Sequence, residues 1–343
     1  MRLIFALFLG WAILAVTGCK ETRESSAFEK NWQRYAQQFY QNGRIVDTGN
    51  DNVSHSEGQG YGMLFAAQAG DRERFDAIWQ WTKKTLQRDD YLFSWRYRPC
   101  PLKNAACIDD TNNASDGDIL IAWALLRASK QWEREQYRTQ ALQIINSIEQ
   151  KLVVEAHGYT VLLPAQQGFT QSLDVQLNLS YWIFPAFTDF YTTTGKPVWK
   201  ALNTSGHQLL GRVAAKKPGL PGDWMWLSKQ KLTVKNAINQ QYGFNACRIP
   251  LHLIWQKPIK TPLLQPYLEF WQQHKIVPAT LNLQTGEPAE YRWSNGMQAI
   301  AQAVRFKLDK RSEAPTAIIA ETDDYFSASL IMLSQLSLAD TEL

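Results

Sequence analysis

The chain has 343 residues, of which 45% are hydrophobic and 20% charged, so it can bury a large core and intrinsic disorder is excluded. Its formal net charge is +4 without a long basic block, which argues against nucleic acid as a partner. Histidine is scarce and no HExxH or CxxC pattern occurs, so we expect no metal site and no cofactor. The fourteen tryptophans suit either helix packing or stacking on sugar rings.

The amino terminus resembles a lipoprotein signal. Residues 3–16 form an apolar run with the length of a signal-peptide core, too short to span a bilayer comfortably. The run ends in Val16-Thr17-Gly18-Cys19, which resembles a bacterial lipobox. We therefore expect a signal peptide over 1–19, lipidation of Cys19, a tether over 20–30 and an exported protein anchored in the outer membrane, facing the periplasm or the cell surface. An ordinary signal peptide with an incidental cysteine is the alternative.

Beyond residue 30 the apolar positions recur with the period of helices, and no linker longer than a loop interrupts them. This predicts one all-α domain over 31–338. The segments with the clearest helical period are 75–86, 119–126, 137–152, 264–271, 297–308 and 326–333. One stretch, Gly158 to Pro164, alternates and predicts a short strand.

Three cysteines remain after the amino-terminal one. Cys100 and Cys107 bracket a proline-containing loop, so export would permit a local disulfide between them. Cys247 has no neighbouring His and acid, and we expect it to be a buried free thiol.

Two acidic motifs stand at predicted helix starts. The first, Ser56-Glu57-Gly58-Gln59-Gly60-Tyr61-Gly62, places an acid among three glycines that allow close approach of a ligand or of another helix. Helix capping by Ser and Glu is the simpler interpretation. Three glycines with Gln and Tyr between them favour a site.

The second motif runs from Asp109 to Asp118 and holds four aspartates and two asparagines. An EF-hand beginning at Asn112 fails, because Ala114 cannot coordinate calcium and Trp123 stands at the twelfth position. Capping accounts for one or two of these acids only. Acids at two helix starts are suited to glycosidic hydrolysis, where one carboxyl donates a proton and another stays ionised.

These motifs also resemble a known family. The stretch from Ala114 to Ala128, with Trp132 beyond it, resembles the signature of glycoside hydrolase family 8, and Ser56 to Gly62 resembles its acid motif. Further matches follow in order at 178–182, 221–224 and 246–250, so the resemblance spans nearly the whole chain after residue 30. Within the family the chain looks most similar to the endoglucanases that accompany bacterial cellulose synthesis.

The resemblance implies an (α/α)6 barrel and endo-acting, inverting hydrolysis of a β-1,4-linked polysaccharide such as cellulose. Glu57 would be the general acid, and Asp116 the carboxylate at the cleavage point. The other residues that we expect to bind substrate are Tyr61, Asp110, Asn113, Trp132, Tyr181, Asn245 and Arg248. Trp95, Trp123, Trp132 and Trp182 are candidates for sugar stacking. We expect a monomer, with a polysaccharide synthesis or export complex as a further partner.

One residue departs from the endoglucanase pattern. The position before Ala246 carries the general-base aspartate in that branch, but here it is Asn245, whose amide cannot accept a proton from water. In a chitosanase-like branch Asn is usual and a Glu on an inserted loop acts instead, yet no acid lies between Trp224 and Asn245. Asp110, Asp174 and Asp223 are the candidate substitutes. The alternatives are therefore a chitosanase or xylanase, or a catalytically weak protein that binds glycan.

Overall fold

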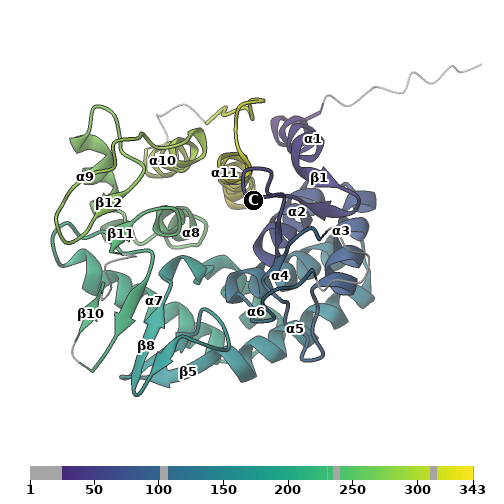
Figure 1. Cartoon of the computed structure of the whole chain (residues 1–343), viewed down its shortest axis with the longest axis horizontal. Helices are drawn as coiled ribbons and strands as arrows, with labels where there is room; N and C mark the ends of the chain where they lie inside the picture. The colour runs from purple at the N-terminus through teal and green to yellow at the C-terminus, as the bar shows by residue number, and fades with distance from the viewer. Residues whose placement is uncertain (1–24, 101–106, 230, 235–239, 310–314, 343) are drawn as a thin grey trace, which may run out of the picture.

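The computed structural model describes residues 25–100, 107–229, 231–234, 240–309 and 315–342 (Figure 1). The predicted signal peptide and Cys19 lie outside the described residues. None of the described helices is long and apolar enough to cross a membrane.

Helices dominate the described residues. The α-helices are α1 (Ala27–Phe39), α2 (Ser56–Gln68), α3 (Arg72–Thr85), α4 (Ser115–Gln131), α5 (Glu135–Leu152), α6 (Phe184–Thr194), α7 (Val198–Ala214), α8 (Ile249–Ile254), α9 (Gln265–Gln273), α10 (Asn295–Leu308) and α11 (Tyr325–Glu342). Short 3-10 helices are η1 (Leu179–Tyr181), η3 (Ala246–Arg248) and η4 (Thr261–Leu263). Every segment with a clear helical period is helical, which confirms the all-α prediction.

The helices form a ring with inner and outer members (Figure 1). The inner helices α2, α4, α6, α8, α10 and α11 pack on one another around the ring, and the outer helices α1, α3, α5 and α7 pack against α11, α2, α4 and α6. Helices α2 and α4 are buried on nearly all sides, whereas α3 and α5 bury one apolar stripe, as expected for inner and outer positions. The arrangement confirms the predicted (α/α)6 barrel.

Strands are short and lie between the helices. They are β1 (Tyr40–Gln41), β2 (Arg44–Ile45), β3 (Ser54–His55), β4 (Arg96–Tyr97), β5 (Val153–Ala156), β6 (Tyr159–Leu162), β7 (Thr170–Gln171), β8 (Asp174–Leu177), β9 (Met225–Leu227), β10 (Leu232–Thr233), β11 (Gln241–Tyr242) and β12 (Leu281–Asn282). Strand β6 confirms the prediction over 158–164, and it pairs with β5. The four-stranded sheet β10-β9-β8-β7 was not predicted, because strands of two to four residues are too short to show an alternating pattern.

The first helix begins earlier than the sequence suggested. Ser26 accepts a hydrogen bond from the Glu29 backbone N–H, and Glu29 accepts one from the Ser26 backbone N–H, which together form a capping box. Helix α1 therefore starts at Ala27, inside the range 20–30 that was predicted to be a tether.

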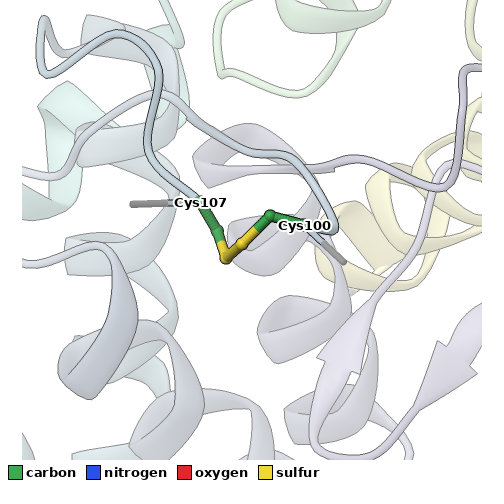
Figure 2. The surroundings of a disulfide bond; sticks show 2 residues. All are labelled: Cys100 and Cys107. Carbon is green, nitrogen blue, oxygen red and sulfur yellow. A yellow bond between two sulfur atoms is a disulfide. The ribbon is translucent and has the colours of Figure 1, made fainter. Parts of the chain in front are cut away.

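The predictions for Cys100, Cys107 and Cys247 are confirmed. Cys100 and Cys107 form a disulfide with their Cα atoms 5.4 Å apart (Figure 2). Close to it, the Arg98 backbone N–H donates to the Cys107 carbonyl at 2.9 Å. Cys247 is a buried free thiol.

Glycines let α2 and α4 pack closely. A Cβ atom at Gly117 would lie 2.1 Å from Ser56 Oγ, and one at Gly60 would lie 2.5 Å from the Leu120 Cβ. Neither distance is sterically allowed, so a larger residue at either position would push the two helices apart. Gly60 of the first motif and Gly117 of the second therefore serve helix packing, and they bring the first turns of α2 and α4 together.

Candidate active site

Several elements begin at the same end of the ring and bring predicted residues together. Glu57 lies in the first turn of α2 and Asp116 in the first turn of α4. Tyr181 ends η1, and Asn245 and Arg248 lie at the two ends of η3. We refer to this end of the ring, defined by Glu57, Asp116, Tyr181, Asn245 and Arg248, as the carboxylate end.

Arg248 connects the charged groups of the carboxylate end. Its side chain is 5% exposed, and Nη1 forms an ion pair with Glu57 Oε2. Nη2 donates to Asn245 Oδ1 at 2.9 Å and to Ser180 Oγ at 3.2 Å, and it lies 3.9 Å from Asp116 Oδ2. A buried guanidinium with these contacts fixes the position of both carboxylates.

The two carboxyl groups titrate as one unit. Burial raises the pKa of Glu57, but the Arg248 cation and a hydrogen bond with Asp116 lower it and together outweigh burial. The net pKa of Glu57 therefore lies below the ordinary value. Burial and the negative charge of Glu57 hold the pKa of Asp116 well above its ordinary value. In the free protein, a proton shared by the pair therefore resides on Asp116.

Two tyrosines border this pair. The Tyr61 hydroxyl accepts a hydrogen bond from Arg248 Nη1 at 3.4 Å, and the side chain is buried. Tyr181 is half-buried and contacts Trp224 edge to face, with ring centroids 6.2 Å apart. Burial raises the pKa of both phenols well above the ordinary value, so both stay neutral and can donate a hydrogen bond.

Asp223, the first candidate substitute for a base at position 245, is hydrogen-bonded to backbone N–H groups. Its Oδ1 accepts hydrogen bonds from the backbone N–H groups of Gly243, Asn245 and Ala246 at 3.1, 3.1 and 2.8 Å. The carboxylate thus holds the turn that presents Asn245. Burial raises its pKa, which the hydrogen bonds from Ala246 and Asn245 partly oppose.

The other two candidates also have partners elsewhere. Asp174 Oδ1 lies 3.8 Å from His157 Nε2. Exposed Asp110 accepts hydrogen bonds from Trp95 Nε1 at 2.8 Å and from the Asn112 backbone N–H at 2.9 Å, and these two bonds lower its pKa.

Trp132 and Asn113, two of the predicted substrate-binding residues, contact groups other than the five residues of the carboxylate end. Trp132 follows the last residue of α4, about 24 Å along the helix axis from Asp116, and contacts the Phe75 ring edge at 5.0 Å between centroids. Asn113 is 2% exposed, and its amide is used internally: Nδ2 donates to Asp118 Oδ2, and Oδ1 accepts from the Gln166 backbone N–H. The Asn113 amide thus serves internal contacts, whereas the Trp132 ring is half-buried at the far end of α4.

Of the tryptophans considered for sugar stacking, one lies near the acids. Trp123 and Trp182 are 2% and 0% exposed and pack between helices. Trp95 is half-buried, its ring stacks on His55 with centroids 5.9 Å apart, and its carbonyl accepts from the Ser56 backbone N–H. Trp95 is therefore the one member of that set beside Glu57.

Sequence reasoning missed Phe244. This ring precedes Asn245, is 41% exposed and meets Phe326 edge to face at 5.4 Å between centroids. Its only signal in the sequence was adjacency to the Ala-x-Arg-x-Pro motif, because Phe326 is far away along the chain and belongs to α11. An exposed aromatic pair beside Asn245 is suited to packing on the apolar face of a sugar.

Comparisons with known proteins agree over nearly the whole chain. The sequence model for glycosyl hydrolases family 8 matches residues 8–340. A probable endoglucanase of Novacetimonas hansenii is 34% identical over 344 residues, which cover 98% of each protein. The structure of endoglucanase Cel10, a family 8 glycosyl hydrolase from Klebsiella pneumoniae, matches with a TM-score of 0.84 at 41% identity, covering 91% of this chain and 99% of that one. The endo-beta-1,4-glucanase CMCax from Acetobacter xylinum matches with a TM-score of 0.86 at 33% identity, covering 92% and 99%.

Proposed function

Because this chain belongs to glycoside hydrolase family 8, we propose that it is an endo-β-1,4-glucanase that hydrolyses internal bonds of a cellulose-like polysaccharide with inversion. The observation that carries the proposal is the buried contact of Glu57 and Asp116 with Arg248 at one end of the ring. Glycosidic cleavage requires one carboxyl group that gives a proton and another that stays ionised, and this pair can supply both once the proton held by Asp116 in the free protein reaches Glu57.

In this proposal Glu57 is the general acid. Its first-turn position on α2 leaves the side chain 21% exposed, whereas the side chain of Asp116 is 5% exposed. Because the free protein keeps the shared proton on Asp116, we infer that the proton passes to Glu57 along their hydrogen bond when sugar displaces water from the carboxylate end. Asp116 then becomes the ionised group that steadies the positive charge developing on the sugar ring.

The attacking water needs a base on the opposite face of the ring, and Asn245 supplies an amide there instead. Its Oδ1 accepts from Arg248, so the Nδ2 donor is the part left to face water. This observation favours a second candidate function, a protein that binds glucan and cleaves it slowly or not at all. A chitosanase or xylanase would use the same two acids, Glu57 and Asp116, on a different polysaccharide.

The first test is hydrolysis of carboxymethyl-cellulose, chitosan and xylan by residues 20–343, the protein without its predicted signal peptide and lipidated Cys19. We expect new reducing ends from carboxymethyl-cellulose, a rapid fall in its viscosity that marks internal cleavage, and an α-anomeric product by proton NMR. Reducing ends released from chitosan or xylan alone would make that polymer, and not a cellulose-like glucan, the substrate. Binding of cellohexaose without any reducing ends would support the glucan-binding function.

We also propose that the protein is a lipoprotein of the outer membrane, anchored through Cys19 and facing the periplasm or cell surface, where it acts on glucan as a monomer beside a synthesis or export complex. The apolar run at 3–16 and the lipobox-like residues that follow it support this. We expect the full chain in the membrane pellet and a Cys19→Ser variant in the soluble fraction. A wild-type protein that is soluble after signal cleavage would contradict the anchor.

A further inference from the structure

A second aspartate of α4, Asp118, is buried close to the proposed catalytic pair and has no role in the proposed chemistry. It lies two residues after Asp116 and is 0% exposed. Its Oδ1 accepts the Phe93 backbone N–H at 2.9 Å, and its Oδ2 accepts Asn113 Nδ2 at 2.7 Å. One carboxylate therefore ties α4 to residue 93, which is 25 positions away, and to the loop directly before the helix.

Those segments lead directly to Glu57. Trp95, two residues after Phe93, accepts the Ser56 backbone N–H at its carbonyl, at 2.9 Å, and Ser56 precedes Glu57. The Trp95 backbone N–H donates in turn to the carbonyl of Asn112 at 2.9 Å. Two hydrogen bonds, joined by the backbone from Phe93 to Trp95, thus connect Asp118 on α4 to the first turn of α2.

We propose that Asp118 is a positioning residue that sets the separation of Glu57 and Asp116 by holding residues 93–95 against the first turn of α4. The inference rests on the proposed function, since it assumes that these two carboxyl groups act together. A misplacement of about 1 Å is enough to lower turnover by about 10²-fold when reacting groups must be aligned.

The contacts require a carboxylate at position 118. Both partners, the Phe93 N–H and Asn113 Nδ2, are donors, so an amide at 118 would present its own NH2 group to one of them. Asn113 cannot rotate its amide to compensate, because its Oδ1 already accepts the Gln166 backbone N–H at 2.8 Å. Asp118→Asn therefore breaks one of the two contacts.

The protonation state of Asp118 acts on the same contacts. Burial raises its pKa to about 7, although the hydrogen bonds from Asn113 and Phe93 and the charge of Arg88 lower it, while the charge of Asp90 raises it. Below that pH one oxygen carries a proton and turns it toward a donor, which weakens the contact. The two contacts are thus complete only above neutral pH.

The experiment compares Asp118→Asn with the exchange Asp118→Asn/Asn113→Asp. In the exchange, Nδ2 at position 118 donates to the new carboxylate at 113, which also accepts the Gln166 N–H, and the Phe93 N–H keeps an amide oxygen as acceptor. We expect kcat on carboxymethyl-cellulose to fall by about 10- to 10²-fold in Asp118→Asn with little change in KM, and the exchange to recover most of it. Wild-type kcat in Asp118→Asn, or an exchange variant no better than the single one, would overturn the proposal.

A second measurement does not depend on activity or on the folding of Asp118→Asn. With selective ¹⁵N-Phe labelling and assignment through Phe93→Leu, the Phe93 amide shift of the wild type should titrate with a midpoint near pH 7. In the exchange variant that midpoint should be lost. A Phe93 shift that is the same in the wild type and in the exchange variant at every pH would refute the positioning role, whereas a clear titration without any hydrolysis would refute only the proposed function.

Discussion

Glu57→Gln is expected to lower kcat on carboxymethyl-cellulose by about 10²- to 10⁴-fold, because an amide has no proton to give to the leaving oxygen. The variant should still fold. The Gln side chain has the same shape, and its carbonyl oxygen can accept from Arg248 Nη1, as the carboxylate does now. Binding of cellohexaose, measured by calorimetry, should change little, which separates loss of chemistry from loss of the site.

The substitution also changes the neighbouring carboxyl group. The charge of Glu57 is the second cause, after burial, of the raised pKa of Asp116. Without that charge, the Arg248 cation acts on Asp116 alone, so its pKa should fall and its proton should leave at lower pH. The matched control is Glu73→Gln, an exposed acid in the first turn of the outer helix α3, which should keep wild-type activity. Full activity in Glu57→Gln would show that another group is the acid.

Asn245→Asp is expected to raise kcat by about 10²- to 10⁴-fold, the range contributed by a general base. The neighbourhood is already suited to a carboxylate, because Arg248 Nη2 donates to Asn245 Oδ1 at 2.9 Å and would keep the new group ionised. The turn that carries it is held by Asp223 through backbone N–H groups, so the change of side chain leaves its support intact.

Two further variants show whether a gain in kcat in Asn245→Asp comes from the new carboxylate acting as a base. Asn245→Ala removes the amide without adding a base, so it reports the cost of the lost Arg248 contact by itself. The double variant Glu57→Gln/Asn245→Asp should stay inactive, because a base without an acid does not complete the reaction. Equal rates for wild type and Asn245→Asp would mean that another base is in place. Activity that appears only in Asn245→Asp would make the natural protein a glucan binder.

Much of this molecule was readable from local patterns. Helical periods predicted α3, α4, α5, α9, α10 and α11, because a buried stripe repeats every three to four residues wherever a helix packs. The disulfide between Cys100 and Cys107 was predictable because the two residues are close in the chain. The acids Glu57 and Asp116 were found through motifs at helix starts, where the sequence itself places a side chain in the first turn.

Contacts between distant segments were decided by the tertiary structure. Arg248 lies 191 positions from Glu57, and only the closed ring of helices brings their side chains together. The same limit applies to two other predicted residues. Trp132 belongs to the family-like signature, but α4, a helix of 17 residues, places it at the end opposite to Asp116. Asn113 stands among the predicted site residues in sequence, yet its amide bonds to Asp118 and to the Gln166 backbone. Local pattern determines which residues form a helix and where it starts, whereas the direction of each polar side chain depends on partners that folding brings from elsewhere in the chain.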